Sequence, residues 1–438
     1  MLQSHVCITH SIYIYINVCV CVMMLSYILT NIFLLTELYH FRAVFARGIQ
    51  PIHLQSAGPI TCNRSHDLYD LCSINGPTLL EPITYTLYAM VPNSNQQSEW
   101  LKTRPYPRKT DKRAMSNVKE LTLTSAPHST QCEVTHNSPA LVFSAAGYTG
   151  NFFHDFNDGF IPLFITINSL FFNQDVILVI SECHGGWPYK YAELLSHFSR
   201  HPIIKIAKET TTHCFPSVIV GLISHGSMIV DPTLLKPHPK SLLDFRIFLE
   251  NTYKKGDDVL SDRPKLVLVS RKGNVGRVIL NQQEVIKAAE EIGFDVNVFE
   301  PTNTSLAEAF KIIDSSHAML GVHGAGLTHL LFLRPGAILM QVVPIGTDWA
   351  SDSCYKVPAL NLGLEYMEYK IEEKESSLAE EYGPNDLVLK DPIAFVGGNY
   401  TNMRVYLRTQ NVKLDIVRFK RYLRKVYKKA KKFMDMEY

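Results

Sequence analysis

The sequence predicts an α/β protein whose C-terminal half holds a parallel sheet. Between residues 265 and 344, short β-branched runs alternate with amphipathic helical segments, in the order strand, helix, strand, helix, strand. This order is typical of parallel strands joined by right-handed crossovers. Two further apolar runs, at 140–147 and 175–181, flank a helical pattern and predict a second α/β region. A length of 438 residues is sufficient for two such domains.

Residues 1–47 are predicted to form a retained membrane signal anchor. Residues 11–36 carry no charge and, as a helix, could cross a bilayer core of roughly 30 Å. The positive charges follow this span instead of preceding it, which conflicts with the usual charge rule. The run "IYIYINVCVCV" is what AT and GT repeats encode when translated. We therefore expect residues 1–22 to be translated non-coding sequence, with the true start at Met23, Met24 or in an upstream exon.

Composition divides the remainder of the chain. Residues 48–110, rich in Pro, Asn, Ser and Gln, predict a stem and an irregular cap. Residues 111–250 predict an N-terminal α/β domain, and 263–400 a C-terminal one that follows a polar linker. Residues 411–433 predict a basic helix that packs on the body. Its apolar stripe is expected to contain Leu414, Val417, Tyr422, Leu423, Val426, Ala430 and Phe433.

Local signals fix several helices in these domains. The pattern "NQQEVIKAAEEIGF" predicts a helix that stops at Gly293, and Ser305 with Glu308 predicts a capping box for the next helix. The segment "NFFHDFNDGFIPLFITINSLFF" predicts a helix with a proline midway.

The charge distribution argues against one class of partner, and the cysteines indicate the cellular compartment. Residues 411–433 carry a net charge of +9 out of a total of +2, so the rest of the chain is acidic. Because basic residues crowd one helix, the sequence argues against a nucleic-acid partner. Cys62 and Cys72 flank a short polar loop that suits a local disulfide in an oxidising compartment. Sequons at Asn63 and Asn399 predict glycans, whereas Asn303 precedes a helix at the expected ligand edge and is expected to be bare.

A glycine-rich turn is the strongest functional signal. In "GVHGAGLTH" the glycines follow a predicted strand and open a helix, where free N–H groups attract anions. Their spacing matches neither the dinucleotide fingerprint nor a P-loop. The loop "SRKGNVGR" places Arg271 and Arg277 at the same edge of the sheet, and two arginines could hold a diphosphate. A lipase-like hydrolase is disfavoured because no G-x-S-x-G elbow occurs.

Several longer motifs resemble glycosyltransferase family 61, particularly its plant xylan arabinosyl- and xylosyltransferases. These motifs are "RPYPRKTDKRAMSNVKELTL", "GYTGNFFHDFNDGFIPLFIT", "VSRKGNVGRVILNQQEV", "GVHGAGLTHLLFLRPGAILMQVVP" and "EEKESSLAEEYGPNDLVLKDP". They run in the family's order from about Cys62 to Pro392. The resemblance implies a GT-B-like pair of facing Rossmann-type domains, with the acceptor on the N-terminal domain and the donor on the C-terminal one. It also implies a UDP-sugar donor, inversion at the anomeric carbon and a type II Golgi membrane protein with a lumenal catalytic part.

The predicted chemistry assigns residues to both domains. No D-x-D string is present, so we expect no metal cofactor, and Arg271 and Arg277 would neutralise the diphosphate. His323 and the N–H groups of Gly324, Ala325 and Gly326 would complete this donor cradle.

His154 and Asp158, four residues apart on a helix, are the predicted catalytic pair. The sequence leaves open which of the two takes the proton. Asp155 is expected to lie on the surface.

The sequence also leaves alternatives open. Transfer of arabinofuranose to xylan is favoured over transfer of xylose. A catalytically inactive carbohydrate-binding relative is the alternative from another class, since His329 stands where the family usually has Asn.

Overall fold

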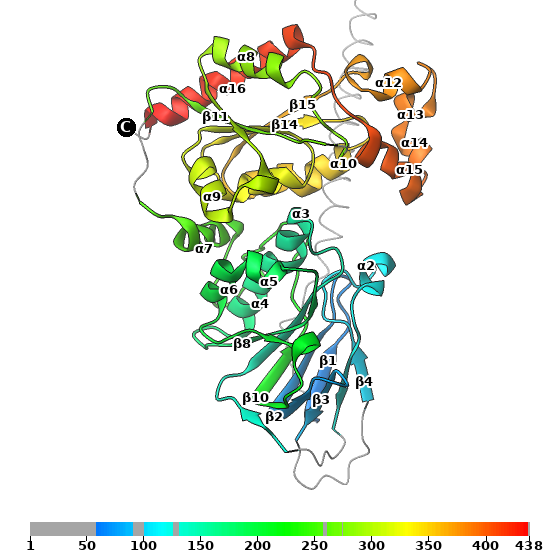
Figure 1. The fold of residues 1–438 in the computed structure, drawn as a ribbon, viewed down its shortest axis with the longest axis vertical. Coiled ribbons are helices and arrows are strands. Elements are labelled where there is room, and N and C mark those ends of the chain that lie inside the picture. The colour runs from blue at the N-terminus through cyan, green and yellow to red at the C-terminus, as the bar shows by residue number, and fades with distance from the viewer. Residues whose placement is uncertain (1–57, 91–99, 126–130, 257–260, 274, 437–438) are drawn as a thin grey trace, which may run out of the picture. The chain divides into compact units, whose positions relative to one another are not determined.

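The computed structural model describes residues 58–90, 100–125, 131–256, 261–273 and 275–436, which belong to one compact unit with two sheets (Figure 1). The predicted anchor at residues 1–47, and with it the hypothesis about residues 1–22, lies outside these ranges. Within them, no helix is both long enough and apolar enough to cross a bilayer.

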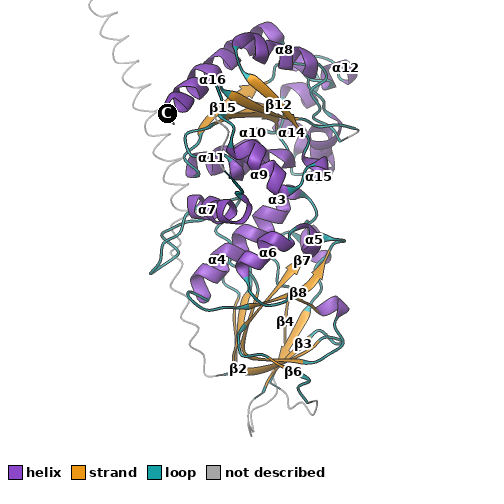
Figure 2. Cartoon of the chain, turned by 60° about the vertical axis from the view of Figure 1, so that its left-hand side comes forward, coloured by secondary structure: helices purple, strands orange, loops and turns teal. Residues whose placement is uncertain are grey.

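The N-terminal sheet contains ten strands in the described part of the chain. Their hydrogen-bonded order is β4-β5-β3-β2-β10-β7-β8-β9, with β1 added to β2 and β6 to β10. The strands are β1 (Ile60–Asn63), β2 (Leu71–Glu81), β3 (Thr86–Ala89), β4 (Trp100–Thr103), β5 (Leu121–Thr124), β6 (Val134–Thr135), β7 (Ala140–Ala145), β8 (Ile177–Cys183), β9 (Ile204–Lys205) and β10 (His213–Val220). Figure 2 shows short helices gathered where β7 and β8 end.

Two predictions for this region are wrong. The prediction of an irregular stem and cap at 48–110 is wrong for the described part of that range, 58–90 and 100–110, because it contributes β1 to β4 to the sheet. The turn-forming residues of β2, Asn75 to Pro77, lie opposite a register shift in β10, so they mark a bulge and do not end the strand. The N-terminal domain is also not of the all-parallel Rossmann type, since β2 pairs antiparallel with both β3 and β10. Only its β10-β7-β8-β9 side is continuously parallel.

The C-terminal sheet is parallel throughout, as predicted. Its order is β12-β11-β13-β14-β15. The strands are β11 (Lys265–Val269), β12 (Asp295–Phe299), β13 (Ala318–Val322), β14 (Ile338–Val343) and β15 (Glu365–Lys370). Helices α8 (Gln282–Ile292) and α9 (Leu306–Asp314) form the first two crossovers, and α8 stops at Gly293 with φ of 119°. The glycine-rich turn therefore leaves β13 at the carboxyl edge of the sheet.

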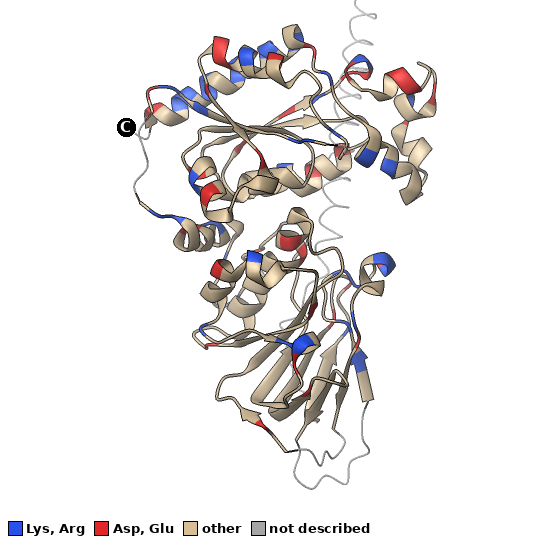
Figure 3. Ribbon diagram, in the orientation of Figure 1, with Lys and Arg blue, Asp and Glu red and all other residues tan. Residues whose placement is uncertain are grey.

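The basic terminal helix, α16 (Ile416–Met436), packs on this sheet beside α8. Its buried side chains are Phe419, Leu423, Val426, Ala430, Phe433 and Met434. The prediction that Val417 belongs to this stripe is wrong: it is 74% exposed, because Phe419, two residues on, faces the sheet. Figure 3 shows Lys and Arg along the helix, and Lys420 forms a 2.6 Å ion pair with Glu291 of α8.

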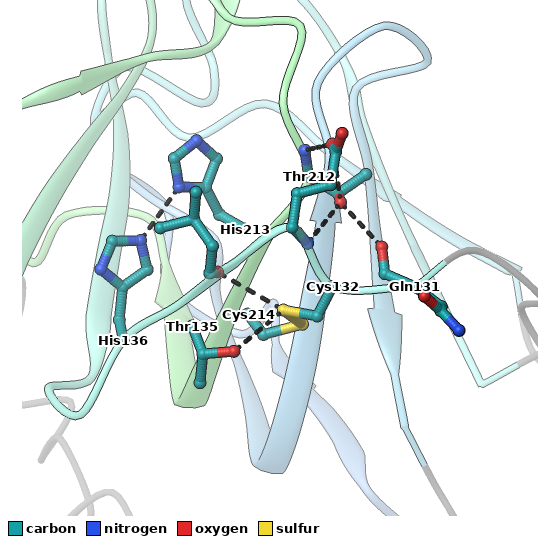
Figure 4. The surroundings of a disulfide bond; sticks show 9 residues. Gln131, Cys132, Thr135, His136, Thr212, His213 and Cys214 are labelled. Atoms are coloured by element: carbon teal, nitrogen blue, oxygen red, sulfur yellow. Dashed lines mark hydrogen bonds between the residues drawn. A yellow bond between two sulfur atoms is a disulfide. The ribbon is translucent and has the colours of Figure 1, made fainter.

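Two disulfides lie in the N-terminal sheet, and each joins two of its segments. Cys62 of β1 and Cys72 of β2 are directly opposed in register and joined. Cys132 and Cys214, separated by 82 residues, join the segment before β6 to β10 (Figure 4). Around the second disulfide, the Thr212 hydroxyl donates to the Gln131 carbonyl at 2.9 Å. The sequence did not single out this second pair, because its partners are distant along the chain.

The three sequons lie in different local structures. Asn63 is the last residue of β1 and so does not lie outside the sheets, as its loop position suggested. Asn399 is exposed and caps helix α15 (Tyr400–Arg404). Asn303 is exposed at the end of a short 3₁₀ turn before α9. Their glycosylation stays a prediction.

Candidate active site

The predicted catalytic pair lies on a helix that changes type along its length. Helix α3 (Phe152–His154) leads into a π-helical turn, Asp155–Phe160, and then into α4 (Ile161–Leu170). Pro162 has no N–H to give to the carbonyl of residue 158, which favours the wider turn. The π turn brings Asp158 inward, so its side chain is buried.

Asp158 accepts four hydrogen bonds. Its Oδ2 atom accepts from the Tyr106 hydroxyl at 2.8 Å, Arg108 Nε at 2.8 Å and His154 Nδ1 at 2.9 Å. Its Oδ1 atom accepts from Asn157 Nδ2 at 2.5 Å. Burial, the largest influence, raises the pKa of this carboxyl, but the hydrogen bond from His154 and the charge of Arg108 outweigh it and lower the pKa overall. Asp158 is therefore an ionised acceptor that is buried and already bonded at both oxygens.

This arrangement separates the roles that the sequence left open. His154 Nδ1 also lies 3.4 Å from Arg108 Nη2, but the shorter contact to Asp158 indicates that Nδ1 carries a proton and donates it. The Nε2 atom of His154 then has its lone pair free. The side chain is 23% exposed, so Nε2 is the group of the pair that can accept a proton from a substrate.

Asp155 is not on the surface, and that prediction is wrong. Its side chain is fully buried and accepts from Trp187 Nε1 at 3.0 Å, the Tyr191 hydroxyl at 2.6 Å and the Gly150 N–H at 2.7 Å. These partners come from "HGGWPYKY" and the GYTG turn. Because they lie outside the helix, its periodicity could not predict that Asp155 is buried. Asp155 anchors the first turn of the helix that carries the catalytic pair.

Tyr106 and Arg108 are site residues that the sequence reasoning missed. They lie in "RPYPRKTDKR", which was assigned to the irregular cap, and they reach Asp158 across a separation of about fifty residues. The available signal was the motif itself, since Tyr106 lies between two prolines that restrict the backbone and Arg108 follows the second of them. Periodicity could not reveal their partner.

The predicted donor loop brings its two arginines together. Arg277 Nη1 donates to the His323 carbonyl at 2.9 Å. A Cβ atom on Gly324 would lie 2.5 Å from Arg271 Nη1 and 3.4 Å from Arg277 Nη1, so only glycine leaves room for both guanidinium groups. Among the described residues, neither arginine has a carboxylate within ion-pair distance, and Arg277 Nε is buried without a partner.

The pKa of each arginine lies below its ordinary value. Burial and then the neighbouring Arg271 lower the pKa of Arg277 to about 10, and burial lowers that of Arg271. Each guanidinium therefore gains from the arrival of an anion, which would supply the missing negative charge.

The last part of the chain holds this loop in place. Arg277 has a left-handed backbone, with φ of 57°, and its N–H donates to the carbonyl of Gln410. Val278 N–H donates to Asn411 Oδ1 at 3.0 Å, and Leu280 N–H to the Val412 carbonyl at 2.8 Å. The segment that precedes α16 thus fixes the backbone from which Arg277 extends.

His323 lies behind the arginines as a neutral donor. Its Nδ1 atom accepts from Gln341 Nε2 at 3.0 Å, and the Tyr366 hydroxyl donates to Gln341 Oε1 at 2.9 Å, which fixes the amide orientation. Burial and then Arg277 and Arg271 lower the pKa of His323 to about 3. Because Nδ1 is an acceptor, the proton of the neutral ring is on Nε2.

The other predicted cradle residues open the next helix, a 3₁₀ helix at Ala325–Phe332. Ala325 and Gly326 are partly exposed, and the N–H groups of a first helical turn lack intrahelical partners. Gly326 is required for packing, because a Cβ atom there would lie 2.9 Å from Val269 Cγ1. The backbone at 324–326 can therefore supply donors beside the arginine pair.

Aromatic contacts connect the donor loop to the catalytic helix. His329 Nδ1–H donates to the Gly326 carbonyl at 2.8 Å, and its ring stacks on Phe152 with centroids 4.1 Å apart. The Tyr355 hydroxyl donates to the Gly324 carbonyl at 2.7 Å, and its ring meets Phe153 edge-on with centroids 6.0 Å apart. His329 is thus a structural link and does not enter the arginine pair.

Comparison with known proteins identifies the family of this chain. The profile described as Glycosyltransferase 61 matches residues 150–340, which include His154, Asp158 and the donor loop. The chain is 38% identical to xylan glycosyltransferase MUCI21 of Arabidopsis thaliana, over 86% of this chain and 81% of that protein. It is 36% identical to alpha-1,3-arabinosyltransferase XAT3 of Oryza sativa subsp. japonica, over 84% of this chain and 65% of that protein, just under two thirds of its length. It is 34% identical to beta-1,2-xylosyltransferase XYXT1 of the same organism, over 74% of this chain and 71% of that protein. The chain belongs to glycosyltransferase family 61.

Proposed function

We propose that this glycosyltransferase moves a pentose from a UDP-sugar to xylan, with inversion at the anomeric carbon. The observation that carries the proposal is His154, whose Nδ1 is committed to a buried aspartate and whose Nε2 is free. The names of the relatives, which specify xylan, arabinosyl and xylosyl transfer, support the substrates. We further propose a GT-B-like arrangement, with the donor on the C-terminal sheet and the acceptor on the N-terminal one.

In the proposed reaction, His154 Nε2 takes the proton from a hydroxyl group of the acceptor sugar. The oxygen of that hydroxyl attacks the anomeric carbon of the donor at the same time. The C–O bond to the diphosphate breaks as the new C–O bond forms, and UDP leaves with the electron pair. Asp158 stabilises the imidazolium that results and holds its orientation, and Arg108 keeps that carboxylate ionised.

The departing diphosphate is stabilised by the protein in this proposal. Arg271 and Arg277 supply positive charge, while His323 Nε2–H and the N–H groups at 324–326 supply neutral donors. We propose that no metal or other cofactor takes part, because a half-buried arginine pair, with no carboxylate at ion-pair distance among the described residues, already provides this charge.

For the donor sugar we favour arabinofuranose, with xylose as the alternative within the family. The relatives include both kinds of transferase, and the donor loop contacts only the part that the two donors share. The alternative from another functional class is a carbohydrate-binding relative without catalytic activity. Its only support is His329, which stands where the family usually has Asn, and that side chain packs on Phe152, outside the arginine pair.

A donor panel tests the proposal. The full chain is incubated with UDP-arabinofuranose, UDP-xylose and hexose donors, with xylohexaose as acceptor, with and without EDTA, and products are read by mass and linkage analysis. Arabinofuranosyl product that resists EDTA is expected. Product from UDP-xylose alone would reverse the donor choice, loss with EDTA would refute metal independence, and no turnover with any donor would favour the inactive relative.

We also propose that the protein is a single-pass type II Golgi membrane protein with its catalytic part in the lumen. Two disulfides favour an oxidising compartment. Co-localisation with a Golgi marker and protease protection of the catalytic part in sealed vesicles are expected. Digestion without detergent would refute the lumenal placement.

A further inference from the structure

A tyrosine lies directly beside the base, and the mechanism does not use it. The ring centroid of Tyr148 is 4.9 Å from that of His154, with 46° between the ring planes, and the side chain is half-buried. Building on the proposed function, we propose that Tyr148 is the platform on which the accepting pyranose ring stacks, so that one of its hydroxyls meets His154. The face of a pyranose carries C–H groups that pack on the negative face of an aromatic ring.

The ring of Tyr148 is held rigidly, as a platform requires. Its hydroxyl donates to Asp111 Oδ1 at 3.1 Å, and its N–H donates to the Tyr106 hydroxyl oxygen at 3.1 Å. Tyr106 in turn donates to Asp158. Gly147 permits this packing, because a Cβ atom there would lie 2.6 Å from the Tyr106 ring. Asp111 thus holds the ring of Tyr148, and Tyr106 connects the Tyr148 backbone to Asp158, the carboxylate that binds the base.

A second aromatic ring continues the surface. Asp111 caps helix α2 (Lys112–Ser116), and Arg113 of that helix lies over the ring of Tyr400, with Cζ 5.2 Å from the centroid. Tyr400 is 57% exposed. Asp111, which accepts from the Tyr148 hydroxyl, also accepts from the Arg113 N–H at 3.1 Å, so the helix that carries Arg113 begins beside the Tyr148 hydroxyl. We assign Tyr400 and Arg113 to a neighbouring sugar of the same chain, the ring for stacking and the guanidinium for hydroxyls.

The ligand class that fits is a neutral chain of pyranose units. Arg108 Cζ lies over one face of the Tyr148 ring, 5.7 Å from its centroid, and Arg113 lies over one face of Tyr400, so we assign the opposite ring faces to C–H groups and the guanidinium groups to hydroxyls. Asp111 and Asp158 already accept several donors each, so they do not call for a cationic ligand. The RPYPRKTDKR and GYTG motifs thus meet in one acceptor surface.

Equilibrium binding of xylohexaose to the full chain, with UDP present, tests the assignment without requiring turnover. Tyr148→Ala is expected to weaken xylohexaose binding about tenfold, whereas Tyr148→Phe keeps the ring and most of the affinity. Tyr400→Ala is expected to weaken xylohexaose binding while leaving xylobiose binding unchanged. Trp100→Ala, at a 61% exposed aromatic residue on edge strand β4, is the matched control and should bind as wild type does.

The outcomes separate this inference from the proposed function. Unchanged xylohexaose affinity in Tyr148→Ala would overturn the platform, even if the wild-type chain transfers sugar. UDP affinity is measured in each variant, and an equal loss of UDP and xylohexaose binding would also overturn it, because the change would then be general. Binding is repeated on Asn399→Gln, which removes any glycan beside Tyr400. A wild-type chain that binds xylohexaose but transfers nothing would refute the proposed function and leave the platform standing.

Discussion

The buried histidine that links the two halves of the site should make the fold sensitive to acid. His329 is 3% exposed, and its Nδ1–H donates to the Gly326 carbonyl. Burial lowers its pKa to about 3; the bond to Gly326 opposes this, and the nearby charge of Lys190 adds to it. We predict that His329→Asn, whose amide can still donate to that carbonyl, removes this sensitivity.

The sign and the size follow from proton linkage. Below its ordinary pKa, the histidine of the unfolded chain takes up a proton that the folded chain refuses, so the free energy of unfolding falls as the pH falls. The pKa of His329 is 6.5 in the unfolded chain and about 3 in the folded one, so the free energy of unfolding keeps falling as the pH falls from the first value to the second. From about pH 7 to about pH 5, the loss from one such histidine is about 2 kcal/mol.

Urea denaturation across this pH range measures the effect as a difference between variant and wild type. His329→Asn is expected to be less stable at neutral pH by about 1 kcal/mol, because stacking on Phe152 is lost, and to regain about 2 kcal/mol relative to wild type towards pH 5. The other buried histidines are common to both proteins and cancel. His184→Asn, at an exposed histidine, is the matched control. A difference that stays constant with pH would refute the reasoning, since His329 would then titrate freely in the folded chain.

Three further predictions follow from the same geometry. Asp158→Asn should lower the transfer rate about ten-thousand-fold by removing the acceptor that fixes the tautomer of its histidine, while the Kd for UDP stays near wild type; a smaller than tenfold loss would exclude that role. Gly324→Ala should displace the guanidinium of Arg271 and weaken UDP binding by about ten- to a hundredfold in calorimetry, and unchanged binding would contradict the cradle. Replacing Cys132 and Cys214 by Ser should lower the free energy of unfolding by about 4–5 kcal/mol, because the bond closes a loop across 82 residues; denaturation curves that match those of wild type would argue against the pairing.

The parts of the fold that periodicity encodes were predictable. The strands and crossovers around "KLVLVS" and "AMLGVHG" depend on contacts within a few residues, and their parallel order follows from connection lengths. The same applies to His154 and Asp158, whose spacing on one helix brings them together. Arg271, Arg277 and Gly324 could be assigned to one edge because strand ends of a parallel sheet share it.

What could not be predicted depends on distant partners. The helical pattern places Asp155 on the surface, but the structure buries it against Trp187 and Tyr191. Those two residues lie in a different segment, so the pattern of the helix gives no information about them. Tyr106 and Arg108 lie in a proline-rich stretch that resembles a linker, and their role is defined only by a carboxylate far along the chain. Local rules are weakest where non-local contacts decide a side chain's environment.

The hydrogen bonds from the arginine loop to Gln410, Asn411 and Val412 have a consequence for biosynthesis. Translation proceeds from the N-terminus, so β11 and its arginine loop are made long before Gln410 to Val412 exist. Until those residues arrive, the left-handed backbone of Arg277 lacks the hydrogen bond from its N–H to the Gln410 carbonyl. A nascent chain halted after the last strand would hold both sheets yet lack a finished donor site, so competence to bind UDP should appear only at the end of synthesis.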